Sequence, residues 1–274
     1  MVNWSLKKTY NVQDLMEIVR ILRHPGGCPW DREQTHQSIR RNFLEETYEA
    51  AEAIDRNDVD GLKEELGDVL LQVFFHTSIE EDAGRFNLDD VADGVCKKLI
   101  YRHPHVFGDV TVHSTGEVLS NWEELKKKEK HQDTQADAVD AVARTLPALW
   151  RAEKMKKKAA KAGFDWRDIS GALDKLSEEL GELKAAALNE EGDPVEELGD
   201  LLLAAVSVAR FLDADPETAL HAACDKFTAR FRKTEELAGS SGQKMDELSE
   251  QELTALWKEA KKESDRDLQR HAAL

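Results

Sequence analysis

The strongest constraint on the fold is an internal repeat. Residues 64–71 read EELGDVLL and residues 196–203 read EELGDLLL, which differ at one position of eight. An acidic cluster precedes each copy, because Glu45-Glu46-Thr47-Tyr48-Glu49 corresponds to Glu178-Glu179-Leu180-Gly181-Glu182. Self-similarity of this kind is the signature of a duplicated structural unit.

Two more blocks recur in the same order further along each half. Cys96-x-Lys98-x-x-x-Arg102 matches Cys224-x-Lys226-x-x-x-Arg230, and Trp122-x-Glu124-x-Lys126-Lys127 matches Trp257-x-Glu259-x-Lys261-Lys262. All four offsets lie between 128 and 135 residues. Chance in an acidic chain can supply one such match, but it does not readily supply four.

We therefore predict two homologous domains, residues 1–135 and residues 136–274. A chain of 274 residues is long for one helical bundle and comfortable for two domains. The boundary is expected in the polar stretch 131–140, which lacks apolar periodicity and follows a lysine run.

Apolar residues at helical spacing, together with only six prolines, predict an all-α fold. The segment 107–117, rich in glycine and β-branched residues, is expected to be a loop or a short strand. The predicted helices cover residues 12–23, 37–54, 59–81, 88–102, 171–188, 194–212, 216–237 and 250–264.

The acidic motifs are expected to converge. Residues three apart share one face of a helix, as do Glu46 with Glu49 and Glu65 with Asp68. The two helices are joined by a short turn and should lie antiparallel, so that four carboxylates meet. The second half repeats the set with Glu179, Glu182, Glu197 and Asp200.

Such a cluster needs a neutralising cation, since like charges at close range repel. Mg²⁺ prefers oxygen ligands and retains waters for substrate phosphates. No Glu-x-x-His motif occurs in these helices, which argues against a di-iron bundle. The alternative is a solvated acidic face. Gly67 and Gly199 argue against that alternative, because a mid-helix glycine costs about 1 kcal/mol and indicates close approach of a helix or ligand.

Basic and aromatic residues follow the acidic motifs. Lys226 with Arg230, and Lys98 with Arg102, are four apart and can hold phosphates, unless they simply pair with acidic neighbours. An indole can stack on a base beside a lysine, or can be a core or interface anchor. The pairs concerned are Trp257 with Lys261 and Trp122 with Lys126. Lys175, one turn before Glu179, is a weaker candidate for binding phosphate.

The composition restricts the binding partners and the cellular compartment expected for the protein. The net charge of −17 disfavours sequence-independent binding to nucleic acids or anionic membranes. Three cysteines without zinc spacing, no leader and no long apolar run indicate a cytoplasmic protein. Cys96 and Cys224 are expected to be small buried residues, and His36 and His76 ordinary packing or surface residues.

The acidic pattern, Glu-Glu-x-x-Glu and then Glu-x-x-Asp about fifteen residues later, resembles the MazG family of nucleoside triphosphate pyrophosphohydrolases. The segment CPWDREQTH, which contains Asp31, closely resembles the entry to the N-terminal domain of that family. The likeness covers nearly the whole chain, including the tandem arrangement.

The resemblance implies an all-α fold built on a four-helix bundle, usually dimeric. It implies that the eight motif carboxylates bind Mg²⁺, for which Mn²⁺ can substitute, and that nucleoside triphosphates yield monophosphate and pyrophosphate. Glu45 and Glu178 would orient a water or ligand. The C-terminal half is expected to be the main catalytic half, with Glu178, Glu179, Glu182, Glu197 and Asp200. The alternatives are a base-restricted dUTPase-like or dCTPase-like enzyme and a non-catalytic nucleotide-binding regulator.

Overall fold

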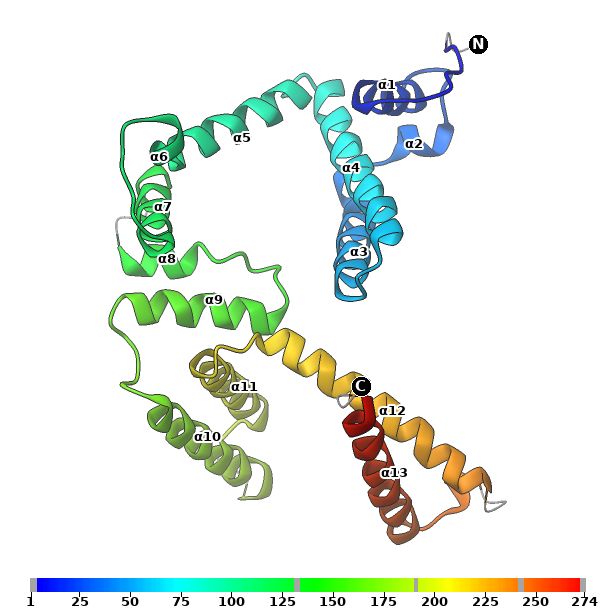
Figure 1. The fold of residues 1–274 in the computed structure, drawn as a ribbon, viewed down its shortest axis with the longest axis vertical. Helices are drawn as coiled ribbons and strands as arrows, with labels where there is room; N and C mark the ends of the chain where they lie inside the picture. Colours follow the sequence, from blue (N-terminus) through cyan, green and yellow to red (C-terminus); the bar gives the residue numbers. More distant parts are fainter. Residues whose placement is uncertain (1–3, 131–133, 190–191, 241–243, 272–274) are drawn as a thin grey trace. The chain divides into compact units, whose positions relative to one another are not determined.

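The computed structural model describes residues 4–130, 134–189, 192–240 and 244–271, with side chains as far as Glu263. Within these ranges all regular structure is helical, which confirms the predicted all-α class (Figure 1). None of the described helices is both long enough and apolar enough to cross a membrane. The chain divides into two compact units, Met1–Lys126 and Lys127–Leu274, each described by itself.

Capping side chains determine where three helices of unit 1 begin. Asn11, Thr35 and Asn87 each form a capping box at a helix start, as short polar residues do at N-caps. The helices are α1 (Val12–Arg23), α2 (Pro29–Glu33), α3 (His36–Asp55), α4 (Val59–Asp82), α5 (Leu88–Arg102), α6 (Pro104–Phe107) and α7 (Thr115–Glu129), the last crossing the unit boundary.

A tight turn makes α3 and α4 antiparallel neighbours, as predicted. Asn57 adopts a left-handed φ of 53°, and the Asp58 side chain accepts a hydrogen bond from the Gly61 amide at 3.0 Å. The two helices pack along each other, and α1 packs on α4. Their buried core contains Met16, Val19, Ile39, Phe74 and Phe75.

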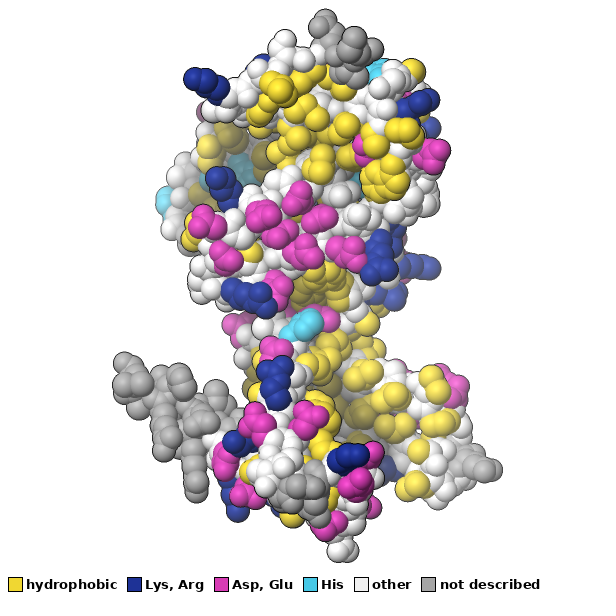
Figure 2. All heavy atoms as spheres, turned by 90° about the vertical axis from the view of Figure 1, so that its right-hand side faces the viewer, with side chains coloured by type: hydrophobic (Ala, Val, Ile, Leu, Met, Phe, Trp, Pro, Cys, Tyr) yellow, Lys and Arg dark blue, Asp and Glu magenta, His cyan; other side chains and the backbone are white. Residues whose placement is uncertain are grey.

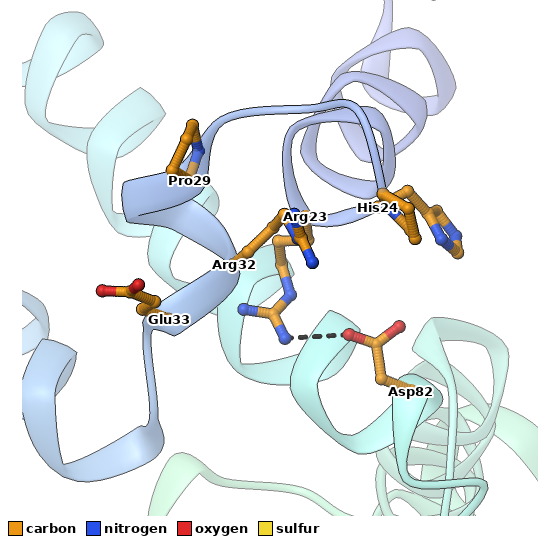
Figure 3. A pocket seen from close by; sticks show the side chains of 7 residues that line it. Arg23, His24, Pro29, Arg32, Glu33 and Asp82 are labelled. Atoms are coloured by element: carbon orange, nitrogen blue, oxygen red, sulfur yellow. Dashed lines mark hydrogen bonds and ion pairs between the residues drawn. The ribbon is translucent and has the colours of Figure 1, made fainter.

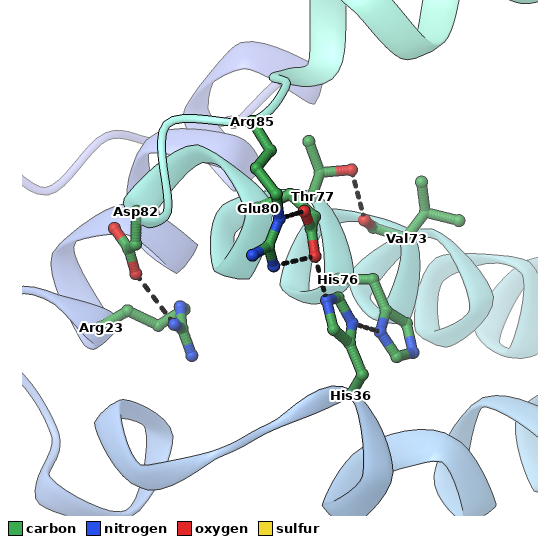
Figure 4. Close-up of polar contacts among 8 residues, drawn as sticks. All are labelled: Arg23, His36, Val73, His76, Thr77, Glu80, Asp82 and Arg85. Carbon is green, nitrogen blue, oxygen red and sulfur yellow. Dashed lines mark hydrogen bonds and ion pairs between the residues drawn. The ribbon is translucent and has the colours of Figure 1, made fainter.

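A polar chain joins the start of α3 to the end of α4 (Figure 4). Nδ1 of His36 lies 2.7 Å from Nδ1 of His76. Nε2 of His36 lies 2.5 Å from Oε1 of Glu80. Arg85 donates two hydrogen bonds to Glu80, which is 8% exposed. Both histidines are half-buried and their ring centroids lie 5.0 Å apart, so the expectation of packing residues is confirmed, whereas the link to Glu80 was not predicted. The Arg85 guanidinium and then His36 lower the pKa of Glu80 to about 2.

Unit 2 repeats the arrangement of unit 1. Its helices α10 and α11 pack along each other as α3 and α4 do, and α9 packs on α11 as α1 packs on α4. Helix α9 was not predicted, although Ala148, Ala152, Met155 and Ala159 recur at helical spacing. The helices are α8 (Gln135–Asp140), α9 (Ala148–Lys161), α10 (Ile169–Asn189), α11 (Pro194–Phe211), α12 (Pro216–Ser240) and α13 (Glu250–His271), with a 3₁₀ turn at Met245–Glu247.

One expectation about connections is confirmed and another needs correction. Most of the segment 107–117 is a loop, over residues 108–114, between the end of α6 at Phe107 and the start of α7 at Thr115. The polar stretch 131–140 includes α8, because Thr134 forms a capping box and Ala138 is buried. Residues 131–133 lie outside the described residues.

Two expectations about single residues need revision. Among the described residues, a Cβ on Gly67 or on Gly199 would meet no atom within 4 Å outside its own helix backbone, so the expected approach of a neighbouring helix within the chain is wrong, and the approach of a ligand stays a prediction. The space leaves room for a ligand or another chain. Cys96 and Cys224 are exposed rather than buried.

We predict that Glu80→Gln removes a pH-dependent contribution to folding. The pKa of Glu80 is lowered in the folded protein, so ionised Glu80 stabilises the fold. This stabilisation is complete above the ordinary glutamate pKa of 4.5 and is lost as the pH falls through about 2. The difference in unfolding free energy between wild type and variant, from urea titrations, should therefore shrink over that range. Glu17→Gln, in a half-exposed surface pair, is the control and should show no such trend. A constant difference for Glu80→Gln would contradict the assignment.

Candidate active site

Three of the four predicted ligands in unit 2 meet between α10 and α11. Glu179, Glu197 and Asp200 each offer a carboxylate oxygen, and these oxygens all lie within 4.8 Å of one another. Glu179 is 6% exposed. Spacing of three residues places Glu197 and Asp200 on one face of α11. The antiparallel pairing of α10 and α11 then brings Glu179 to the same point.

Unit 1 gathers a different trio. Glu46, Glu49 and Glu65 offer oxygens that lie within 4.8 Å of one another. Asp68 is outside this trio but close enough for its charge to raise the pKa of Glu46. In unit 2, Glu182 similarly lies beside Glu179. Each half therefore brings together three predicted ligands, with the fourth next to them.

Burial and neighbouring negative charges raise the pKa values of three of these carboxyl groups. Burial, and then the charges of Asp68 and Glu49, raise the pKa of Glu46. Burial and Glu49 do the same for Glu65, and burial and Glu179 for Glu182. Negative charge is therefore incompletely balanced in both clusters, and all the donors are carboxylate oxygens. This donor set fits a hard divalent cation.

Lys175 lies at the edge of the cluster in unit 2. Its ammonium is 2.8 Å from Glu179 and 2.6 Å from Glu178, one turn further along α10. These hydrogen bonds raise the pKa of Lys175. The lysine therefore remains charged beside Glu178 and Glu179.

The other predicted substrate residues of unit 2 lie on α12 and α13. Trp257 packs against Phe227, with ring centroids 5.3 Å apart. Lys226 and Lys261 are exposed, and no described hydrogen bond or ion pair links either to the acidic cluster. Arg230 is half-buried on α12. The described contacts therefore link Trp257 to the α12–α13 pair rather than to the carboxylates.

In unit 1, the corresponding residues form a stack between α5 and α7. The guanidinium of Arg102 lies 5.2 Å from the Trp122 ring centroid, and the ammonium of Lys126 lies 4.7 Å from it. Arg102 is 7% exposed, and Lys98 is half-buried. The predicted pairing of Trp122 with Lys126 therefore exists here as a cation–π contact.

Asp31, from the CPWDREQTH segment, has a structural role that sequence reasoning missed. It is buried, and its carbonyl accepts a hydrogen bond from Arg23 at 3.0 Å. Arg23 also bonds Ser78 and Asp82, beside a hollow lined by Arg32 and Glu33 (Figure 3). Arg23 thus ties the entry segment to α4.

The surface carries both acidic and apolar groups. Figure 2 shows acidic side chains gathered on one face, next to hydrophobic ones. Exposed apolar residues of unit 1 include Leu44, Tyr48, Leu66, Leu99 and Ile100.

Comparisons with known proteins identify the family. The MazG nucleotide pyrophosphohydrolase domain matches residues 34–107 and again 168–234. The chain is 44% identical over 249 residues to the nucleoside triphosphate pyrophosphohydrolase/pyrophosphatase MazG of Thermotoga maritima, covering 91% of this chain and 95% of the relative. It is 41% identical over 256 residues to the nucleoside triphosphate pyrophosphohydrolase of Escherichia coli K12, covering 92% and 97%. The uncharacterized protein YabN of Bacillus subtilis is 48% identical over 246 residues, 89% of this chain and 50% of that protein. The chain therefore belongs to the MazG nucleotide pyrophosphohydrolase family, with the domain of that family present twice.

Proposed function

We propose that this protein hydrolyses nucleoside triphosphates to the monophosphate and pyrophosphate, with Mg²⁺, at the carboxylate cluster of unit 2. The observation that carries the proposal is the meeting of Glu179, Glu197 and Asp200 beside the ammonium of Lys175. The names of the Thermotoga and Escherichia relatives support it. The biological role we propose is clearance of unwanted nucleotides from the pool.

The residues that would hold Mg²⁺, or Mn²⁺ in its place, are the motif carboxylates. When bound, the cation would supply charge neutralisation for the phosphate oxygens. The ligands are Glu179, Glu182, Glu197 and Asp200 in unit 2, and Glu46, Glu49, Glu65 and Asp68 in unit 1.

The chain's own groups would do the rest of the chemistry. Glu178, the motif carboxylate outside this proposed ligand set, would accept a proton from the attacking water. Lys175, which pairs with Glu178 and Glu179, would contact a phosphate oxygen and offset its developing charge.

Phosphate binding is also proposed for Lys226, Arg230 and Lys261, with Trp257 near them. The corresponding Lys98, Arg102, Trp122 and Lys126 would serve unit 1. In unit 1 the Trp122 indole already contacts the charged groups of Arg102 and Lys126, which favours a structural role for these three residues. This difference supports unit 2 as the main catalytic unit.

We propose further that the protein is a homodimer. Leu66 is 54% exposed and Ile100 51% exposed, on α4 and α5. Exposed apolar side chains on these helices are candidates for cover by a partner. A second copy of the chain is the partner that the family resemblance favours.

We predict that Glu179→Gln and Asp200→Asn each lower turnover by about 100-fold or more, because each removes charge on which transition-state stabilisation depends. Phosphorus NMR of the eight common nucleoside triphosphates should show monophosphate and pyrophosphate for wild type. The matched controls, Glu46→Gln and Asp68→Asn in unit 1, should retain most activity. If the unit 1 variants are the inactive ones, the assignment of the main catalytic unit is wrong.

We predict that divalent-cation affinity falls as the pH is lowered through the raised pKa values of Glu46, Glu65 and Glu182. Metal binds the deprotonated carboxylates, so each proton displaced weakens apparent affinity by about tenfold per pH unit. Calorimetric titration with Mn²⁺ across neutral and acidic pH measures this slope. Affinity that does not change with pH would contradict binding at these clusters.

A further inference from the structure

Lys175 pairs with one of the carboxylates that a cation in unit 2 would need. Its ammonium lies 2.8 Å from Oε1 of Glu179, and Glu179 belongs to the trio with Glu197 and Asp200. The Glu179 side chain is almost fully buried, so water and salt screen this ion pair less than a surface pair. Lys175 therefore already neutralises part of the charge that a divalent cation would neutralise.

Unit 1 has no lysine at the corresponding place. Alignment of the two acidic motifs pairs Lys175 with Asn42, which is exposed and uncharged. The preceding residue, Arg41, pairs with Glu45 at 2.7 Å, outside the trio of unit 1. In the described part of the chain, no lysine or arginine forms an ion pair with that trio. The two copies of the motif thus differ by one positive charge at the same helical position.

The charges around the two clusters differ accordingly. In unit 1, burial and then neighbouring carboxylates, Asp68 first, raise the pKa of Glu46. In unit 2, burial and then Glu179 raise the pKa of Glu182, whereas Lys175 acts in the opposite direction. The cluster of unit 2 therefore contains its own counterion, and the cluster of unit 1 consists of carboxylates alone.

Two cations on one carboxylate repel each other. A divalent ion held by Glu179 would share that carboxylate with the Lys175 ammonium, and like charges at such short range are unfavourable. Lys175 can move, because its side chain is 36% exposed and its flexible stem carries a compact charge. A phosphate anion would give the ammonium a new partner as it leaves Glu179. Binding of the cation and of the anion would then favour each other, as linked equilibria require.

We infer that Lys175 is an internal counterion that competes with the divalent cation for Glu179. Unit 2 therefore binds the cation weakly by itself, and more tightly together with a phosphate anion that takes up the ammonium. Unit 1, with Asn42 in place of the lysine, binds the cation without an anion. The inference rests on the proposed function and adds that the cation and the substrate phosphates bind unit 2 cooperatively.

The first test measures the Mn²⁺ affinity of the unit 2 cluster by electron paramagnetic resonance, without nucleotide, in a background of Glu46→Gln with Glu65→Gln. In this background Lys175→Met should bind Mn²⁺ about tenfold more tightly, because a close positive charge is removed. Lys175→Arg, which keeps the charge, should stay near the affinity of the background. Lys184→Met removes the same charge from an exposed position on α10 and should stay within about threefold of it.

The reciprocal test uses the unit 1 cluster, in a background of Glu179→Gln with Asp200→Asn. Asn42→Lys places an ammonium one turn before Glu46 and should weaken Mn²⁺ affinity about tenfold. Asn42→Gln is the neutral control and should bind Mn²⁺ as the background does. Circular dichroism checks that each variant keeps its helices.

Inorganic phosphate tests the coupling between anion and cation. In the background that leaves only the unit 2 cluster, phosphate should tighten Mn²⁺ binding about fivefold or more, after correction for Mn²⁺ bound by phosphate in solution. The same phosphate concentration should have little effect in Lys175→Met or on the unit 1 cluster.

Mn²⁺ affinity that is unchanged or weaker in Lys175→Met would overturn the competition, even if wild type releases pyrophosphate. Unchanged affinity in Asn42→Lys would overturn the explanation of the difference between the units. A phosphate effect that persists in Lys175→Met would overturn the coupling through this lysine. Tighter binding in Lys175→Met and weaker binding in Asn42→Lys, with a wild type that releases no pyrophosphate, would support the inference and contradict the proposed function.

Discussion

Repulsion among carboxylates is the constraint on which the arrangement of both units depends. Antiparallel pairs, α3 with α4 and α10 with α11, bring acidic residues from two helices to one point. Burial and the close approach of like charges both disfavour the ionised carboxylates, and together they raise the pKa values of Glu46, Glu65 and Glu182. The packing of each helix pair holds these groups in place. A cation that relieved the repulsion would therefore meet carboxylates that the helix pair already holds together.

The two units use this arrangement differently. Unit 1 buries Phe74 and Phe75 in its core, ties α3 to α4 through His36 and Glu80, and stacks two cations on Trp122. Unit 2 places a lysine against Glu179 and has Val206 and Ser207 at the positions of the two phenylalanines. The two copies therefore keep the carboxylates and differ in the groups around them.

Much of this could be predicted from the sequence, because the signals are local. Helical spacing and capping residues determine α3, α4, α10 and α11 to within a few residues, and spacing of three places each acidic pair on one face. Helix α9 was missed, although its apolar residues recur at helical spacing. The His36–Glu80 contact and the Trp166–Gly171 contact could not be predicted, since each joins residues through tertiary packing or an irregular connection. The exposure of Cys96 and Cys224 depends likewise on what packs beside them.

The most direct test of the account is the number of Mn²⁺ ions that the chain binds, counted by electron paramagnetic resonance. We predict that a double variant, Glu179→Gln with Asp200→Asn, loses the ions held by unit 2 and keeps those held by unit 1. The double variant Glu46→Gln with Glu65→Gln should show the reverse. Equal numbers of bound ions in wild type and both double variants would contradict the claim that the paired helices form the metal sites.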